Sequence, residues 1–244
     1  MRRLAWLAAA VLLAASCGGD DDSSGSDLEG LTVFAAASLT EVFEEIAPEV
    51  TFNFAGSDEL ATQIREGGPA DVYAAASPRY PDELFEEGLI EEPQIFATNE
   101  LVVIVPSGNP AGIGSVADLR EGDVNLVIGA EGVPIGDYTR TVLENMGATD
   151  VLDRVVSNEE DVKGVVGKVV SGDADAGFVY ATDALAAGDD VETIDLPAEA
   201  QAVVRYPIAV LAASENADAA QSFVGLVLGE DGQQALADAG FSPP

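Results

Sequence analysis

The sequence predicts an α/β fold with mainly parallel sheets. From residue 31 onward, short runs of β-type residues alternate with helical patterns, as in strand–helix–strand units. A turn-rich stretch at residues 107–110 follows an apolar strand, and an apolar run at residues 201–211 could bring the chain back. Two such crossings would divide the 244 residues into two lobes with a cleft between them, although the length alone also permits one domain.

The first thirty residues have the layout of an export signal followed by a tether. Two arginines precede a 12-residue apolar run (4–15), which is too short to span a bilayer, and small residues stand directly before Cys17. This context resembles the lipobox of bacterial lipoproteins, although Ala14 stands where leucine is commoner. The resemblance implies a signal peptide at 1–16 and a lipid on Cys17. The alternative is a plain secretory signal with a stray cysteine. Residues 17–29 are expected to be a disordered acidic linker.

The expected elements follow from hydrophobic periodicity and from capping residues. Valines at positions 162, 165, 166, 169 and 170 form one apolar helical face, and Gly147 is a plausible C-terminal cap. Strands are expected at residues 31–36, 50–54, 71–75, 101–105, 124–128, 177–180 and 203–211. Helices are expected at residues 139–146, 162–170, 219–228 and 233–239.

Composition excludes several classes of function. The chain has 10 Lys and Arg residues against 44 Asp and Glu residues, a formal net charge of −34. Acid spread along the whole chain indicates a solvated acidic surface, suits an extracytoplasmic setting, and argues against nucleic acid as a partner. With no His and one Cys, the chain lacks the residues for Ser–His catalysis, for a His-built zinc site and for an internal disulfide.

Two serines stand where a strand gives way to a helix. Ser38 follows the first strand and has Glu41 three residues later, the spacing of a capping box, so a helix should begin here. Ser57 follows Gly56 after the second strand. Hydroxyls at the positive end of a helix are well placed to hold an anion, and simple helix capping is the alternative at both positions.

Three later positions are also candidates for binding an anion. Ile135 follows Pro134 at an expected helix start, Val162 opens the valine-faced helix, and Tyr180 ends a strand with a phenol. N–H groups in a first helical turn have no partner within the helix and could bind an anion. Ordinary loop-to-helix junctions, and core packing for the tyrosine, are the alternatives.

Taken together, these segments are very similar to the periplasmic molybdate-binding proteins of ABC importers, from about residue 31 to residue 241. The similarity lies in VFAAASLT (33–40), PADVYAAA (69–76), LVVIVP (101–106), VP (133–134), EDVKG (160–164), YATDA (180–184) and YPIAV (206–210), in that order.

The resemblance implies a two-lobed, type II periplasmic-binding-protein fold. Lobe 1 would comprise residues 30–106 and 203–244, and lobe 2 residues 107–202. It also implies capture of molybdate or tungstate for delivery to a membrane permease, with no enzymatic activity, no cofactor and an extracytoplasmic, lipid-anchored location. A monomer is the default. The oxyanion would be held by the hydroxyls and backbone N–H groups of Ser38 and Ser57, the N–H groups of Ile135 and Val162, and the phenol of Tyr180.

A site made only of donors matches a fully deprotonated tetrahedral dianion, which offers only acceptors. Hydrogen phosphate carries a proton and should be rejected, whereas sulfate must be excluded by size. Two departures from the family pattern bear on affinity: Ile135 stands where a small residue is common, and Asp58 where a hydroxyl residue is usual. The alternatives are a binding protein for another oxyanion such as sulfate and, more remotely, a hydrolase.

Overall fold

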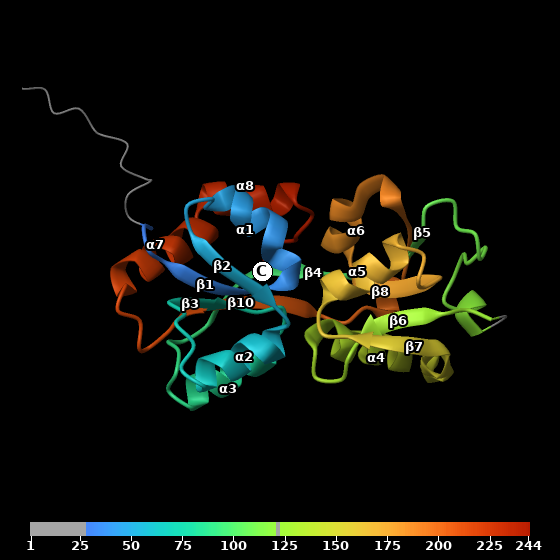
Figure 1. Ribbon diagram of the computed structural model, residues 1–244, viewed down its shortest axis with the longest axis horizontal. Helices are drawn as coiled ribbons and strands as arrows, with labels where there is room; N and C mark the ends of the chain where they lie inside the picture. Colours follow the sequence, from blue (N-terminus) through green and yellow to red (C-terminus); the bar gives the residue numbers. More distant parts are fainter. Residues whose placement is uncertain (1–27, 121–122) are drawn as a thin grey trace, which may run out of the picture.

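The computed structural model describes residues 28–120 and 123–244 (Figure 1). The strands are β1 Thr32–Ala36, β2 Thr51–Ala55, β3 Val72–Ala74, β4 Gln94–Asn99, β5 Leu101–Pro106, β6 Leu126–Gly129, β7 Val155–Glu159, β8 Ala176–Tyr180, β9 Val191–Asp195 and β10 Val204–Val210. The helices are α1 Thr40–Ile46, α2 Ser57–Arg65, α3 Arg79–Glu86, α4 Pro134–Asn145, α5 Val162–Val170, α6 Ala181–Ala187, α7 Ala217–Leu228 and α8 Glu230–Asp238. Short 3-10 helices lie at Ala37–Leu39, Asp118–Arg120, Thr149–Arg154, Gly188–Asp190 and Ala198–Ala200.

The strands form two five-stranded sheets with matching topology. The first has the order β2-β1-β3-β10-β4 and the second β7-β6-β8-β5-β9. In each sheet the first three strands are parallel, and the fourth is antiparallel to both of its neighbours. Four of the five strands therefore run in one direction, which confirms the expected α/β fold with mainly parallel sheets.

The chain crosses between the sheets earlier than the sequence indicates. β4 ends at Asn99 in the first sheet, and β5 begins at Leu101 in the second, where it pairs with β8 and β9. Residues 101–106 were expected in lobe 1 and lie in lobe 2 instead. The turn signal at 107–110 marks a tight reversal beyond β5, where Gly108 and Asn109 adopt φ values of 79° and 40°. The return crossing lies between β9 and β10.

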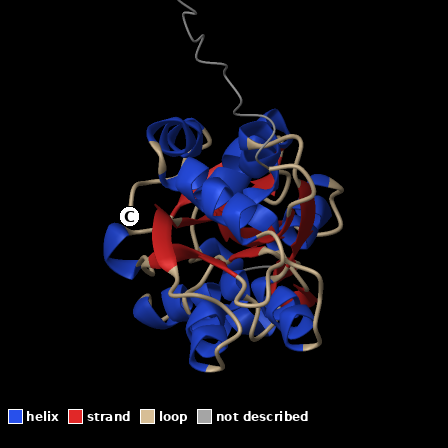
Figure 2. Cartoon of the chain, turned by 90° about the vertical axis from the view of Figure 1, so that its left-hand side faces the viewer, coloured by secondary structure: helices blue, strands red, loops and turns tan. Residues whose placement is uncertain are grey.

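Helices cover both faces of each sheet (Figures 1 and 2). Helix α5 confirms the expected valine face, since Val162, Val165 and Val169 are buried, while Val170 turns outward and is 42% exposed. Helix α4 begins five residues earlier than expected, at Pro134, whose fixed φ suits a first helical position. It ends as predicted, with Gly147 at φ 60° just beyond its C-terminus.

The N-terminal predictions fall largely outside the described residues, because the signal peptide and Cys17 lie within residues 1–27. One part is corrected: Leu28 is only 4% exposed and packs in the core of lobe 1, and its carbonyl accepts from the N–H of Leu31. The linker expected at 17–29 therefore does not extend through Leu28. Over the ranges 28–120 and 123–244, no helix is both long and apolar enough to cross a membrane.

Candidate functional site

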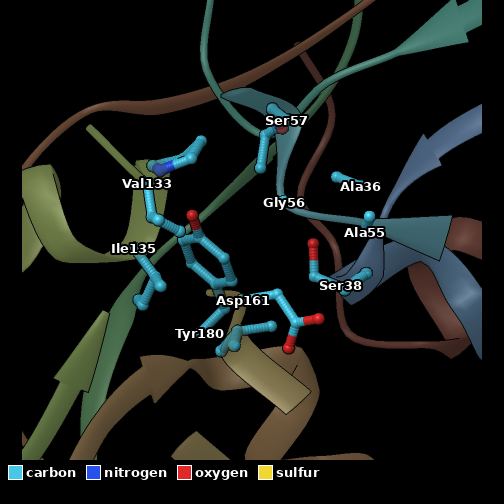
Figure 3. Close-up of a pocket in the computed structure, with 13 residues that line it drawn as sticks. Ala36, Ser38, Ala55, Gly56, Ser57, Val133, Ile135, Asp161 and Tyr180 are labelled. Carbon is cyan, nitrogen blue, oxygen red and sulfur yellow. The ribbon is translucent and has the colours of Figure 1, made fainter. Parts of the chain in front are cut away.

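The five residues predicted to bind the ligand line one pocket between the two lobes (Figure 3). Its volume is about 20 Å³. From lobe 1 it takes the segments that follow β1, β2 and β3, and from lobe 2 the first turns of α4 and α5 and the end of β8. This is where ligands bind in open α/β sheets, beyond the carboxyl ends of the strands. The lining residues are Ala36, Ala37, Ser38, Ala55, Gly56, Ser57, Ala76, Val133, Pro134, Ile135, Asp161, Val162 and Tyr180.

Ser38 lies in the 3-10 helix that follows β1, and its side chain is buried. The expected capping box with Glu41 does not form, since neither this helix nor α1 has a side-chain cap. A 3-10 turn occupies the position where the α-helix was expected to begin. The Ser38 Oγ instead lies 3.0 Å from the hydroxyl of Tyr206, on β10.

Ser57 is the first residue of α2 and is also buried. Its Oγ accepts a hydrogen bond from the backbone N–H of Ala76 at 3.1 Å, and its carbonyl accepts one from the hydroxyl of Tyr73 at 2.7 Å. The helix cap is Gly56, which contributes no side chain, so Ser57 does not cap α2. Since its Oγ already accepts, its own hydrogen is available to a ligand in the pocket.

Tyr180 closes the pocket from lobe 2. It is 1% exposed, and its hydroxyl has no hydrogen-bond partner among the described residues. Burial raises the pKa of this phenol well above its ordinary value, with the nearby Tyr206 adding to the shift, so Tyr180 stays protonated at neutral pH. A buried hydroxyl without a hydrogen-bond partner costs free energy, and a ligand that accepts a hydrogen bond from it removes that cost.

Ile135 and Val162 stand in the first turns of α4 and α5, where backbone N–H groups have no partner within the helix. Val162 follows Asp161, whose carboxylate accepts from the N–H of Gly164 at 2.8 Å and caps α5. The acid that lines the pocket is thus engaged by its own helix. The Ile135 side chain is buried and packs beside Gly129, where an added Cβ would lie 2.6 Å from the isoleucine methyl group.

Asp58, the other departure from the family pattern, does not line the pocket. Its Oδ1 is buried without a partner among the described residues. Burial raises the pKa of this carboxyl, and the nearby N–H groups of Asp58 and Glu59 partly oppose the shift. A raised pKa lowers the cost of keeping this acid close to an anion site.

The two lobes are in direct contact around the pocket, so the structure shows a closed arrangement. The hydroxyl of Tyr80 in lobe 1 donates to the carbonyl of Gly132 in lobe 2 at 2.6 Å. Arg79 lies 3.2 Å from Asp137 across the same boundary. Gly56 abuts the carbonyl of Glu160, since an added Cβ would lie 2.5 Å from that oxygen.

Chemically, the pocket presents hydroxyl groups and helix N-termini, and none of its lining residues is Lys or Arg. Such a set of donors suits a ligand that offers only acceptors. Within the described part of the chain, no group of three or more His, Cys, Asp or Glu side chains is arranged to hold a metal ion. The sequence segments indicated the lining residues, whereas the role of Tyr206 beside Ser38 emerges only from the fold.

The chain is similar to known proteins along nearly its whole length. Residues 31–242 match the model of the family described as bacterial extracellular solute-binding protein. The molybdate-binding protein ModA of Mycobacterium tuberculosis is 37% identical, over 98% of this chain and 97% of its own length. YvgL of Bacillus subtilis, whose name describes it as a putative ABC transporter substrate-binding lipoprotein, is 27% identical, over 98% of this chain and 96% of its own length.

Among solved structures, the periplasmic molybdate-binding protein of Azotobacter vinelandii has a TM-score of 0.77 at 21% identity. The match covers 88% of this chain and 99% of that one. This similarity supports the two-lobed fold. The family match, which spans most of the chain, and the identity to the mycobacterial relative identify the protein as a member of the bacterial extracellular solute-binding protein family.

Proposed function

We propose that the protein captures molybdate or tungstate outside the cytoplasmic membrane and delivers it to the permease of an ABC importer. The observation that carries the proposal is the pocket between the lobes, where three buried hydroxyls and the first turns of α4 and α5 converge. A fully deprotonated tetrahedral oxyanion satisfies every one of these donors and leaves none of its own atoms in need of an acceptor. The names of the curated relatives support molybdate as that oxyanion.

Neutral donors also fit the transport task. Hydrogen bonds to a charged group contribute about 1.5–3 kcal/mol each, so several of them hold the anion firmly. Because the donors come from both lobes, ligand binding stabilises the closed form, and opening the lobes releases the ligand. The distant surface carboxylates are screened beyond a Debye length of roughly 8 Å at physiological salt. They oppose binding much less than the net charge suggests.

Thermal melting of residues 27–244 with molybdate, tungstate, sulfate and phosphate tests the proposal. A ligand at a hundred times its dissociation constant adds about 2.7 kcal/mol. For a protein of this size that corresponds to a rise in Tm of roughly 5–11 °C. We expect the rise with molybdate and tungstate only. A rise with sulfate alone would keep the binding role and change the ligand, and no rise with any of the four would overturn the proposal.

The location and partners belong to the same proposal. We place the protein outside the membrane as a monomer, tethered by a lipid on Cys17, and the name of the Bacillus relative supports the lipid anchor. Mass spectrometry of the mature N-terminus tests this directly. A diacylglyceryl group on Cys17 is expected, together with release of the Cys17→Ala protein from the membrane fraction. An unmodified Cys17 would contradict the lipid anchor and favour a plain secretory signal.

A further inference from the structure

A chain of buried polar side chains leads from the crossover between the lobes to the pocket. The Asn99 Nδ2 lies 3.5 Å from the hydroxyl of Tyr206, and that hydroxyl lies 3.0 Å from the Ser38 Oγ. All three residues are buried, Tyr206 completely. The chain joins the end of β4, the middle of β10 and the turn after β1, three segments that are distant in the sequence.

The direction of these hydrogen bonds follows from the backbone. The N–H of Glu100 donates to the Asn99 side chain at 2.9 Å, which identifies the accepting atom as Oδ1. The Asn99 Nδ2 therefore faces Tyr206 and the Oγ1 of Thr182, the latter at 2.9 Å. Because an amide nitrogen only donates, the Tyr206 oxygen accepts from Asn99.

Ser38 is then the one remaining acceptor for the Tyr206 hydrogen within the described residues. In that arrangement the Tyr206 hydroxyl donates to the Ser38 Oγ, and the serine hydrogen, which cannot point back along the same line, is free to point into the pocket. The opposite direction would leave the Tyr206 hydrogen without an acceptor, which is costly for a buried hydroxyl. Burial also raises the pKa of Tyr206 well above its ordinary value, so the phenol stays protonated and can donate a hydrogen bond.

We propose that Tyr206 is a positioning residue that fixes the Ser38 hydroxyl as a hydrogen-bond donor to the ligand and thereby favours fully deprotonated oxyanions. Ser57 follows the same logic, because the N–H of Ala76 donates to its Oγ from behind. Tyr206 is the side-chain counterpart of that backbone donor and can be replaced. The inference rests on the proposed capture of an oxyanion in this pocket.

The test is a double-mutant cycle, with molybdate affinity measured by calorimetry at one fixed salt concentration. Removing the Tyr206 hydroxyl lets the serine hydrogen turn away, so Tyr206→Phe should raise the Kd roughly tenfold, the equivalent of about 1.4 kcal/mol. Ser38→Ala should raise the Kd by at least as much. Adding Tyr206→Phe to Ser38→Ala should change the Kd no further, because Tyr206 acts through Ser38.

Tyr73→Phe is the matched control. It also removes a buried tyrosine hydroxyl from the first sheet, but the partner of Tyr73 is the Ser57 carbonyl and not a serine hydroxyl. Whatever change in Kd it causes should persist in the Ser38→Ala background. If the Tyr206→Phe effect persists there as well, or if Tyr206→Phe leaves the Kd unchanged, the proposal is overturned.

Competition by hydrogen phosphate provides a readout that a purely structural role would not move. In Tyr206→Phe the serine oxygen is free to accept a hydrogen bond from the protonated oxygen of hydrogen phosphate. The phosphate concentration that displaces half of the bound molybdate should therefore be lower than in the wild type. An unchanged ratio of molybdate to phosphate affinity would contradict the proposal. If Tyr206→Phe does not fold, Asn99→Leu removes the donor that directs Tyr206, and its effect should likewise vanish in Ser38→Ala. Failure of the wild type to bind any oxyanion would instead refute the proposed function.

Discussion

The Nζ of Lys163 lies 2.7 Å from the Oε1 of Glu41, and this ion pair joins α5 of lobe 2 to α1 of lobe 1. The same Nζ lies 3.3 Å from the Oδ1 of Asp183, whose side chain is fully buried in lobe 2. Burial lowers the pKa of Lys163, but the charges of Asp183 and Glu41 more than offset it, so the pKa lies above its usual value. Lys163 thus stays charged in its own lobe, and its contact with Glu41 requires the lobes to be closed.

Glu41→Gln should therefore weaken ligand binding without destabilising the unliganded protein. Exposed ion pairs contribute little, so we expect a Kd for molybdate about two- to fivefold higher, mainly through faster dissociation. Stopped-flow dissociation at low and high salt measures this, and the difference should shrink as salt screens the pair. Glu45→Gln is the control, an exposed acid on the same helix with no ion pair among the described residues. An equal effect at Glu45 would indicate a general charge effect.

Asp183 should make the folding stability depend on pH between its ordinary pKa and its raised pKa, and replacing it should remove this dependence. Burial raises the pKa of this carboxyl from 3.8 to about 6, and Lys163 opposes the shift while Glu41 adds to it. Tyr180 and Tyr206, the other titratable groups around it, stay neutral. Between about pH 4 and pH 6 the folded state holds more protons than the unfolded state, so this group lowers stability as the pH rises through the window.

Asp183→Asn has no such titration. The free energy of unfolding of the variant, minus that of the wild type, should increase between pH 4 and pH 6 by up to roughly 3 kcal/mol, since each pKa unit corresponds to about 1.4 kcal/mol. Urea unfolding of both proteins across this range measures the difference, in which the many other acids cancel. A difference that does not vary with pH would mean that Asp183 remains ionised in the folded protein throughout.

The strands that sequence patterning missed share a physical property. β4, β7 and β9 are all edge strands, and β7 alternates half-buried and exposed residues. Strands in the middle of a sheet are covered on both faces and read as continuous apolar runs, as LVVIVP in β5 does. An edge strand lacks that signal. The sequence pattern therefore predicted every interior strand of the two sheets, but only β2 among the four edge strands.

The sequence likewise indicated only part of the candidate site. Five of its lining residues stand at or near the carboxyl ends of strands, and the resemblance of the surrounding segments to a known family indicated them. The partnerships that orient them are long-range: Ser38 and Tyr206 are 168 positions apart, and Glu41 and Lys163 are 122 apart. Local spacing favoured Glu41 as a partner of Ser38 in a capping box, and tertiary contacts gave each residue a different partner.

Gly56→Ala should separate ligand binding from folding. Gly56 has φ −60° and ψ 139°, values that alanine adopts freely, so the backbone sets no barrier. An added Cβ would nevertheless lie 2.5 Å from the Glu160 carbonyl of the other lobe, and 2.7 Å from the movable Asp58 carboxylate. We expect little change in the Tm of the unliganded protein, because the lobes can stay apart. The Kd for molybdate should rise at least about tenfold, since about 1.4 kcal/mol of closure energy is readily lost to such a clash.

Calorimetric titration and thermal melting of the same sample measure both quantities for Gly56→Ala. Gly225→Ala is the control, because Gly225 lies within α7 with no atom near its added Cβ. That change should leave the Kd unaltered and raise stability slightly, as expected for alanine in place of glycine within a helix. A Gly56→Ala protein that binds molybdate as tightly as the wild type would show that the lobes need not approach this closely.

Tyr180→Phe should weaken molybdate binding without destabilising the unliganded protein. The hydroxyl of Tyr180 has no partner among the described residues, so removing it takes no hydrogen bond from the fold, and the stability of the unliganded protein should not fall. The same hydroxyl is a donor to the ligand, so molybdate affinity should fall by roughly tenfold or more, the loss of one hydrogen bond to a charged group. Melting without ligand and titration with molybdate give the two numbers. A fall in both would mean that the hydroxyl has a partner in the free protein and supports the fold, whereas a fall in affinity alone places its role in the bound state.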